Sequence, residues 1–131
     1  MIAAPDGRRV RAVLDWELCT LGDPLADLGC LLAYWPEASD SATAVFQAPR
    51  LPGFPTRREL AERYAAESGR SLDALGFWHA LGLWKIAIIC EGVRRRALDD
   101  ERNAAKGGVP AAHIVDDLIA QALLVAADAG I

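Results

Sequence analysis

The sequence predicts a mostly α-helical protein that begins with a short β-hairpin and continues as a helical bundle. Three observations lead to this fold class. A Pro-Asp-Gly turn at residues 5–7 separates two short apolar runs, as in a hairpin. From residue 24 onward, apolar residues recur at helical spacing between stretches rich in proline and glycine. The 131 residues are 53% hydrophobic and 24% charged, which is enough to bury one core.

The hairpin is predicted over residues 1–16. Its first strand is the apolar run from Met1 to Ala4, and its second, from Val10 to Trp16, reads VRAVLDW. Two strands alone are only marginally stable in water, so the hairpin is expected to pack against another part of the protein. Asp15 would then stand at the end of a buried strand.

The first helix is predicted over residues 24–34. Asp23 is a good N-cap residue, Pro24 suits the first helical position, and leucines at 25, 28, 31 and 32 share one face. Residues 36–55 contain four prolines and form a long loop, in which one helical turn is expected near residues 42–46.

Three more helices follow. Thr56-Arg57-Arg58-Glu59 matches the capping box and opens a helix that runs to about residue 67, with Gly69 closing it. Ser71 can cap the next helix, residues 72–98, which is apolar nearly all round its middle and is therefore expected to be central and buried. The last helix is predicted over residues 113–129, with Ile114, Leu118, Ile119 and Val125 as its core side.

Composition excludes several classes of protein. A net charge of −4 argues against a nucleic-acid partner. The N-terminus lacks the pattern of a signal peptide, and the longest apolar run, residues 74–90, is interrupted by charge and falls short of the about 18–20 residues of a membrane span. The three cysteines form no C-x-x-C pair, so buried free thiols in a reducing, cytoplasmic compartment are expected.

Carboxylates gather around the start of the first helix, and the residues alone leave their roles open. Asp15 is either a strand-ending residue that binds local amides or a ligand of a hard cation such as Mg²⁺. Glu17 is a second carboxylate near such a metal or a solvated loop residue. Asp23 is the helix cap. Asp27 either favours the helix N-terminus electrostatically or accepts hydrogen bonds from a neighbouring loop.

The long apolar helix carries three further candidates. His79 is interpreted as a hydrogen-bonded histidine of the core or of a groove, in preference to a ligand. Lys85 lies midway along the helix, where a lysine needs a partner or must reach solvent. Lys85 is assigned to a substrate cleft together with Trp78, for which core packing is the alternative.

Residues 13–29 read VLDWELCTLGDPLADLG. This stretch resembles the metal-binding segment of the aminoglycoside phosphotransferase-like (choline-kinase-like) kinases, and in particular the branch associated with acyl-CoA dehydrogenases. Asp-Trp-Glu alone would be a weak signal, but Gly-Asp-Pro and Asp-Leu at this spacing make the resemblance specific. The hairpin segment APDGRRVRAV and the helix ending IAIICEGVRRR are also similar to that branch.

The resemblance implies a two-lobed, protein-kinase-like fold, of which this chain resembles the C-terminal lobe. Residues 1–16 would be the hairpin, 17–23 the metal-binding loop and 24–131 the helical subdomain. Asp15 matches the aspartate that holds Mg²⁺ on ATP, and Glu17 is a second candidate ligand. Asp27 matches an aspartate that braces the catalytic loop, and Asp23 supports it as the helix cap.

The chain also departs from the family pattern. The family places its catalytic base in an H-G-D-x-x-x-x-N segment just before the hairpin, and neither histidine here is followed by Gly-Asp. No lysine precedes residue 13, so the small lobe is expected to be missing as well. No catalytic residue is therefore expected to be retained.

The expected function is that of a fragment of an ATP-dependent kinase, inactive alone, whose intact form phosphorylates a small-molecule hydroxyl. A hydroxyacyl-CoA is a candidate acceptor. The alternative is a non-catalytic helical module that binds a protein partner or forms a homodimer through exposed apolar surface.

Overall fold

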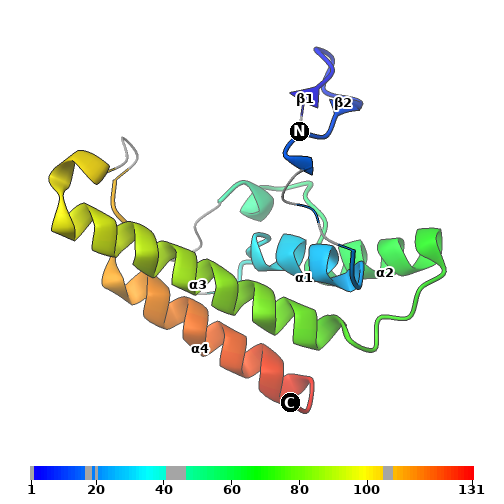
Figure 1. Cartoon of the computed structure of the whole chain (residues 1–131). Helices are drawn as coiled ribbons and strands as arrows, with labels where there is room; N and C mark the ends of the chain where they lie inside the picture. Colours follow the sequence, from blue (N-terminus) through cyan, green and yellow to red (C-terminus); the bar gives the residue numbers. More distant parts are fainter. Residues whose placement is uncertain (1, 17–18, 20, 41–46, 105–107) are drawn as a thin grey trace.

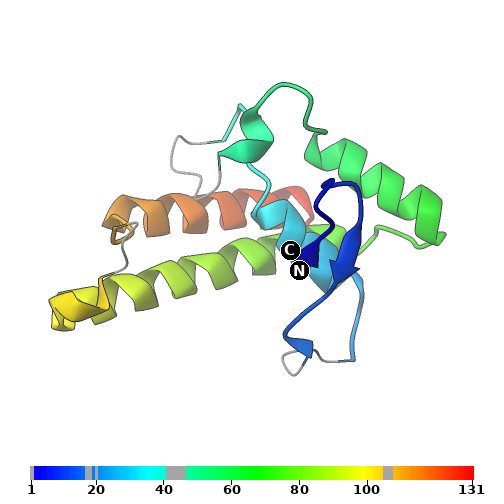
Figure 2. The ribbon, with the colours of Figure 1, turned by 90° about the horizontal axis from the view of Figure 1, so that it is seen from above.

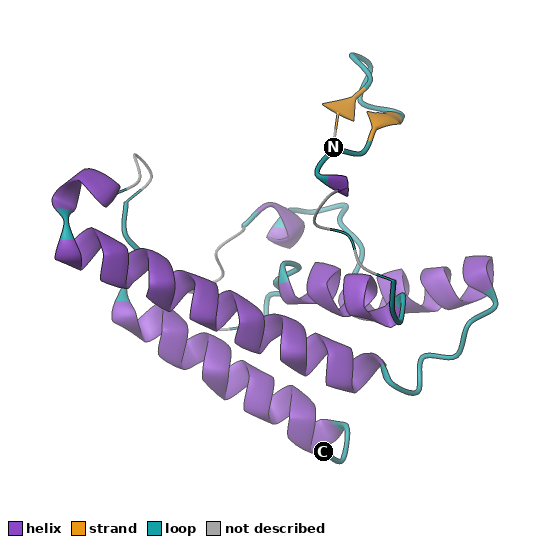
Figure 3. Cartoon of the chain, viewed as in Figure 1, coloured by secondary structure: helices purple, strands orange, loops and turns teal. Residues whose placement is uncertain are grey.

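The computed structural model describes residues 2–16, 19, 21–40, 47–104 and 108–131. Its elements, in order, are β1 (Ile2–Ala3), β2 (Val10–Ala12), α1 (Leu25–Ala33), the 3₁₀ turn η2 (Ala48–Arg50), α2 (Arg57–Ser68), α3 (Leu75–Asp99), the 3₁₀ turn η3 (Glu101–Asn103) and α4 (Ala112–Asp128). The predicted fold class, a short antiparallel hairpin followed by a mostly helical body, is confirmed (Figures 1 and 3).

The long helix α3 is the centre of the helical body, since both α1 and α4 pack against it. Figures 1 and 2 show α4 running back alongside α3. One core cluster joins these two helices through Leu83, Ile86, Ala87, Cys90, Leu118 and Ala122. A second cluster is built on leucines 25, 28 and 32 of α1, against which Leu60 and Tyr64 of α2 pack. Leu60 and Tyr64 are therefore on the inward face of α2.

Two glycines allow α1 and α3 to approach closely. A Cβ atom added to Gly29 would lie 2.4 Å from the carbonyl carbon of Trp78, and one added to Gly82 would lie 3.0 Å from the Gly29 carbonyl oxygen. Real Cβ atoms essentially never come as close to a backbone atom as the first of these distances, and the second is tighter than most real contacts. The crossing of α1 and α3 therefore depends on the missing side chain at Gly29 in particular.

The start of α2 has the predicted capping box. The Thr56 hydroxyl accepts a hydrogen bond from the Glu59 amide at 3.1 Å, and the Glu59 carboxylate accepts one from the Thr56 amide at 2.7 Å. Gly69 ends the helix in the left-handed conformation, with φ at 69°. Local sequence signals thus determine both ends of α2.

Arg57 holds the start of α2 against the end of α1. Its Nε donates to the Leu32 carbonyl oxygen at 3.2 Å, which satisfies one of the last carbonyls of α1. Both terminal nitrogens donate to the Asp40 carboxylate. Burial alone would raise the pKa of Asp40, but the hydrogen bonds from Arg57 and the Glu37 amide, with the Arg57 charge, bring that pKa below its ordinary value.

The second strand is shorter than predicted. β2 ends at Ala12, because its partner β1 has only two residues to pair with. Val13 and Leu14 follow outside the strand and are 46% and 50% exposed. The prediction of a buried strand ending at Asp15 is therefore wrong.

The long helix also differs from its prediction. α3 begins at Leu75, since the Ser71 hydroxyl accepts from the Asp73 amide in a separate turn and caps no helix. Nor is α3 buried all round, because α1 and α4 are the only α-helices with extensive contacts to it among the described elements. Trp84 and Ile88 are 53% and 50% exposed, and Ile119, predicted for the core side of α4, is 40% exposed.

The prediction of three buried thiols holds only for Cys90, since Cys30 is half-buried and Cys19 is exposed. The helical turn predicted near residues 42–46 lies outside the described residues.

Candidate functional site

Asp15 lies on the connection between the hairpin and the helical body, and its side chain is exposed. In Figure 1 the hairpin stands clear of the helices. Asp15 has φ at +66°, and no other non-glycine residue among those described has a positive φ. Aspartate tolerates this left-handed conformation better than most residues, and such conformations occur often at functional sites.

The carboxylate of Asp15 offers one ligand of the kind that a hard cation binds, but not a complete set of ligands. Within the described residues it has no hydrogen-bond or ion-pair partner, so its oxygens are open to a ligand. Mg²⁺ takes one or two carboxylates together with phosphate oxygens and water. No cluster of three histidine, cysteine or acidic side chains that could hold a metal occurs in the described part of the chain. Glu17, the second candidate ligand, lies outside that part.

Asp23 joins the start of α1 to α3. Its Oδ1 accepts from the Leu25 amide at 2.9 Å, and its Oδ2 accepts from the Trp78 indole at 3.0 Å. The predicted cap is displaced by one residue: α1 begins at Leu25 with Pro24 as its N-cap and has no side-chain cap, so Asp23 binds the first helical amide from just before the cap position. The bond to Trp78, 55 residues away in sequence, has no local sequence signal.

Asp27 lies in the first turn of α1, as predicted, and is exposed. It has no hydrogen-bond partner within the part of the chain that the structure describes. Its position favours the helix N-terminus electrostatically. The carboxylate therefore faces solvent and is open to a partner from elsewhere.

Trp78 and Lys85 do not form a common cleft with Asp15 among the described contacts. Trp78 packs on the leucine cluster of α1 and gives its indole hydrogen bond to Asp23. Lys85 is exposed, so the prediction of a lysine on a buried helix is wrong, for the same reason that α3 is not covered all round.

Sequence reasoning missed a hollow of 290 Å³ beside the start of α1. Its lining comes from two distant segments: Asp23, Leu25, Arg70, Ser71, Asp73 and Ala74. The two segments meet because α2 turns the chain back toward α1 before α3 begins, a consequence of tertiary packing.

His79 is buried in the core, with 8% of its surface exposed, which confirms its predicted position but not the predicted hydrogen bond at Nε2. Within the described structure its Nε2 has no hydrogen-bond partner. Burial, with a smaller contribution from the Arg57 charge, lowers the pKa of His79 from 6.5 to about 4; the Asp40 charge opposes this shift. The folded protein therefore keeps His79 neutral.

The low pKa of His79 makes the protein less stable in mild acid. The unfolded chain takes up a proton near pH 6.5 and the folded chain only near pH 4, so stability is lost as the pH falls through this window. We expect the free energy of unfolding to fall by about 2 kcal/mol between pH 7 and pH 5, measured by urea denaturation. A His79→Gln variant should lose this dependence, and an unchanged slope would contradict the assignment.

Within the described residues, no helix has the length and apolarity needed to cross a membrane.

Comparison with known proteins identifies relatives. Residues 1–78 match the model of the phosphotransferase enzyme family. No solved structure matches the chain.

The curated relatives extend the match into α3. Acyl-CoA dehydrogenase family member 11 of Mus musculus is 40% identical over 98 residues, which are 72% of this chain and 13% of the relative. Family member 10 of the same organism is 35% identical over 109 residues, or 80% of this chain and 10% of the relative. The chain thus spans about an eighth or less of the length of these relatives. The resemblance carried by residues 13–29 is confirmed, and the chain belongs to the phosphotransferase enzyme family.

Proposed function

We propose that the chain forms the C-terminal part of an ATP-dependent phosphotransferase domain and that it is inactive on its own. Residues 1–16 would be its hairpin, 17–23 its metal-binding loop and 24–131 its helical subdomain. The observation that carries the proposal is Asp15, inside the segment that matches the family: it is exposed, has no partner among the described residues and adopts a left-handed conformation. The same proposal places the protein in the cytoplasm.

Asp15 would hold Mg²⁺, with Glu17 as a second ligand. The ion, when bound, neutralises charge on the β- and γ-phosphates of ATP. The family otherwise depends on a catalytic base, an asparagine and a phosphate-binding lysine, none of which this chain supplies at matching positions. Phosphoryl transfer is mostly positioning and electrostatic stabilisation, so a chain that offers one ligand alone should not catalyse it.

Asp27 and Asp23 would support the catalytic loop. Asp27 is exposed at the first turn of α1, where its carboxylate can accept hydrogen bonds from a loop of the intact domain. Asp23 fixes that turn through its bonds to the Leu25 amide and the Trp78 indole. Trp78 therefore acts on the site by positioning, and a place for it or for Lys85 in a substrate cleft stays a prediction.

The acceptor would be a small molecule with a hydroxyl group. The curated relatives are named acyl-CoA dehydrogenase family members, and this makes a hydroxyacyl-CoA the candidate. A dehydrogenase acts on the acyl group, so a kinase in the same protein would modify a hydroxyl on a related acyl chain.

The isolated chain and a grafted domain together test this proposal. In the grafted domain, residues 1–131 replace the matching segment of an active member of the phosphotransferase enzyme family. We expect the isolated chain to show no ATP turnover above background in a coupled ADP assay, and the grafted domain to transfer phosphate. Turnover by the isolated chain, or a folded but inactive graft, would contradict the proposal.

A second candidate function is self-association through an apolar groove between α3 and α4. The groove has a volume of 240 Å³ and is lined by Phe77, Ala80, Leu81, Trp84, Ile119, Ala122, Leu123, Ala126 and Ile131. Leu123 and Ile131 are 66% and 63% exposed, and exposed apolar patches of this kind often mark interfaces. Sedimentation equilibrium should then give a dimer that Leu123→Glu dissociates. A monomer at high concentration would contradict this second function.

A further inference from the structure

The hairpin is a basic element in an acidic protein. The chain has a net charge of −4, yet three arginines, at 8, 9 and 11, lie around its first turn. The nearby carboxylate of Asp6 accepts a hydrogen bond from the Arg8 amide at 3.1 Å and so stabilises the turn. Within the described residues, no carboxylate pairs with any of the three guanidinium groups.

Several arginines of the helical body, by contrast, pair with carboxylates. Arg58 and Arg63 pair with Glu62 and Glu67 on α2, at 3.0 and 2.8 Å. Arg94 binds the Glu91 carboxylate through two nitrogens. The hairpin arginines therefore retain a charge that the described chain leaves uncompensated.

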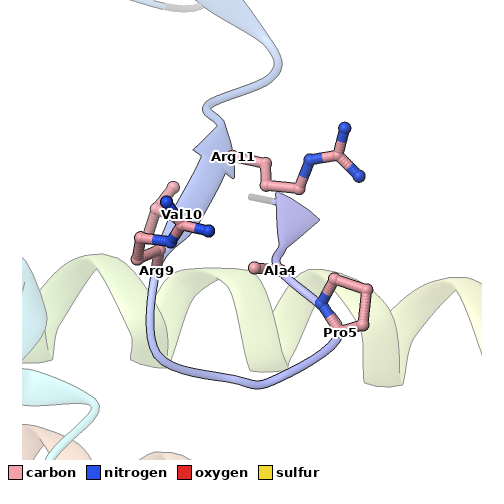
Figure 4. A pocket seen from close by; sticks show the side chains of 5 residues that line it. All are labelled: Ala4, Pro5, Arg9, Val10 and Arg11. Atoms are coloured by element: carbon pink, nitrogen blue, oxygen red, sulfur yellow. The ribbon is translucent and has the colours of Figure 1, made fainter.

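Arg9 and Arg11 also line a hollow in the hairpin, together with Ala4, Pro5 and Val10. Its volume is 460 Å³, within the range of small-molecule sites. In Figure 4 the Arg11 side chain extends from β2 past the end of β1, whereas the side chain of Arg9, the residue before β2, lies on the other side of the strand beside Val10.

We propose that Arg9 and Arg11 bind the pyrophosphate group of a nucleotide. A guanidinium is a planar fork that binds phosphate oxygens through two parallel hydrogen bonds. Two such forks around one hollow suit a ligand with two linked phosphates better than a single carboxylate. Both ATP and a coenzyme A ester carry this group. The choice between ATP and coenzyme A rests on the proposed function. The anion site itself does not depend on that function.

Titration with inorganic pyrophosphate tests the site directly. The chain, labelled with ¹⁵N at arginine Nε, is titrated by NMR in EDTA, so that no metal at Asp15 contributes. We expect saturable shifts at Arg9 and Arg11, and about tenfold weaker binding for the Arg9→Ala/Arg11→Ala variant. Both side chains are exposed, so the variant should fold.

The matched control is Arg95→Ala/Arg96→Ala, which removes the same charge from two exposed positions outside the hairpin and outside the hollows described above. It should bind pyrophosphate within about twofold of the unaltered chain, since screened charges at a distance contribute little. Equal losses in both variants, or equal shifts with sulfate at the same ionic strength, would overturn the proposal. So would tighter binding of a polyglutamate peptide, which would assign the arginines to an acidic protein surface.

Titrations with ATP and coenzyme A then distinguish the two sources. Either nucleotide should bind at least as tightly as pyrophosphate, and the tighter one identifies the ligand. If pyrophosphate binds while the grafted domain proves inactive, the anion site stands and the proposed function fails. If the grafted domain is active and pyrophosphate does not bind, the proposed function stands and the anion site fails.

Discussion

Asp15→Asn is expected to slow phosphoryl transfer by the grafted domain about a thousandfold. The amide keeps the size of the side chain and tolerates the left-handed conformation, at φ +66°, but it loses the charge that holds Mg²⁺. Because the metal stabilises charge on the transferred phosphate, the loss should appear mainly in kcat. Initial rates at saturating ATP, over a range of Mg²⁺ concentrations, measure the effect.

Asp128→Asn is the matched control for Asp15→Asn. It removes the same charge from an exposed position at the end of α4 and should leave the rate within about twofold, because exposed charges at a distance are screened by salt. The role assigned to Asp15 is wrong if both variants retain the original rate. It is also wrong if Mg²⁺ saturates the activity of both variants with the same apparent affinity.

Gly29→Ala is expected to destabilise the chain by about 3 kcal/mol. The new methyl group would meet the backbone of α3, at 2.4 Å from the Trp78 carbonyl carbon and 2.8 Å from the His79 nitrogen. Backbone atoms cannot rotate away, so the two helices must separate, and both the leucine cluster and the Asp23 bond to Trp78 would loosen. Urea denaturation followed by far-ultraviolet circular dichroism measures this loss.

Gly92→Ala provides the control in the same helical context. A Cβ atom there meets only the flexible end of Arg96, at 3.5 Å. Alanine is the better helix former, so this variant should be as stable as the unaltered chain or up to about 1 kcal/mol more stable. If both variants were equally stable, the close crossing of α1 and α3 at Gly29 would be refuted.

The helices could be predicted from local signals. The capping box at Thr56 and the left-handed Gly69 give both ends of α2. The apolar spacing of α1 and α4 gives their extents within a residue or two. These signals are short-range, because a cap or an amphipathic face is set by residues within one or two turns.

Burial and long-range contacts could not be predicted in this way. The composition of α3 suggested a helix covered on all sides, but coverage depends on how many neighbours pack against it, and here α1 and α4 leave Trp84 exposed. The hydrogen bond from Trp78 to Asp23 joins segments far apart in sequence, and so does the hydrogen bond from Arg57 to the Leu32 carbonyl oxygen. For Asp15, the motif indicated the metal, while the exposed, left-handed backbone could be found only in the structure.

Tryptophan NMR tests the central claim, that Asp15 is the metal ligand, most directly. The chain has four tryptophans, and Trp16 is next to Asp15 while Trp78 binds Asp23. With ¹⁵N-labelled tryptophan and increasing Mn²⁺·ATP, the Trp16 signal should broaden first, and Asp15→Asn should abolish this selectivity. Earlier broadening of Trp78, or equal broadening of all four signals, would contradict a metal site at Asp15.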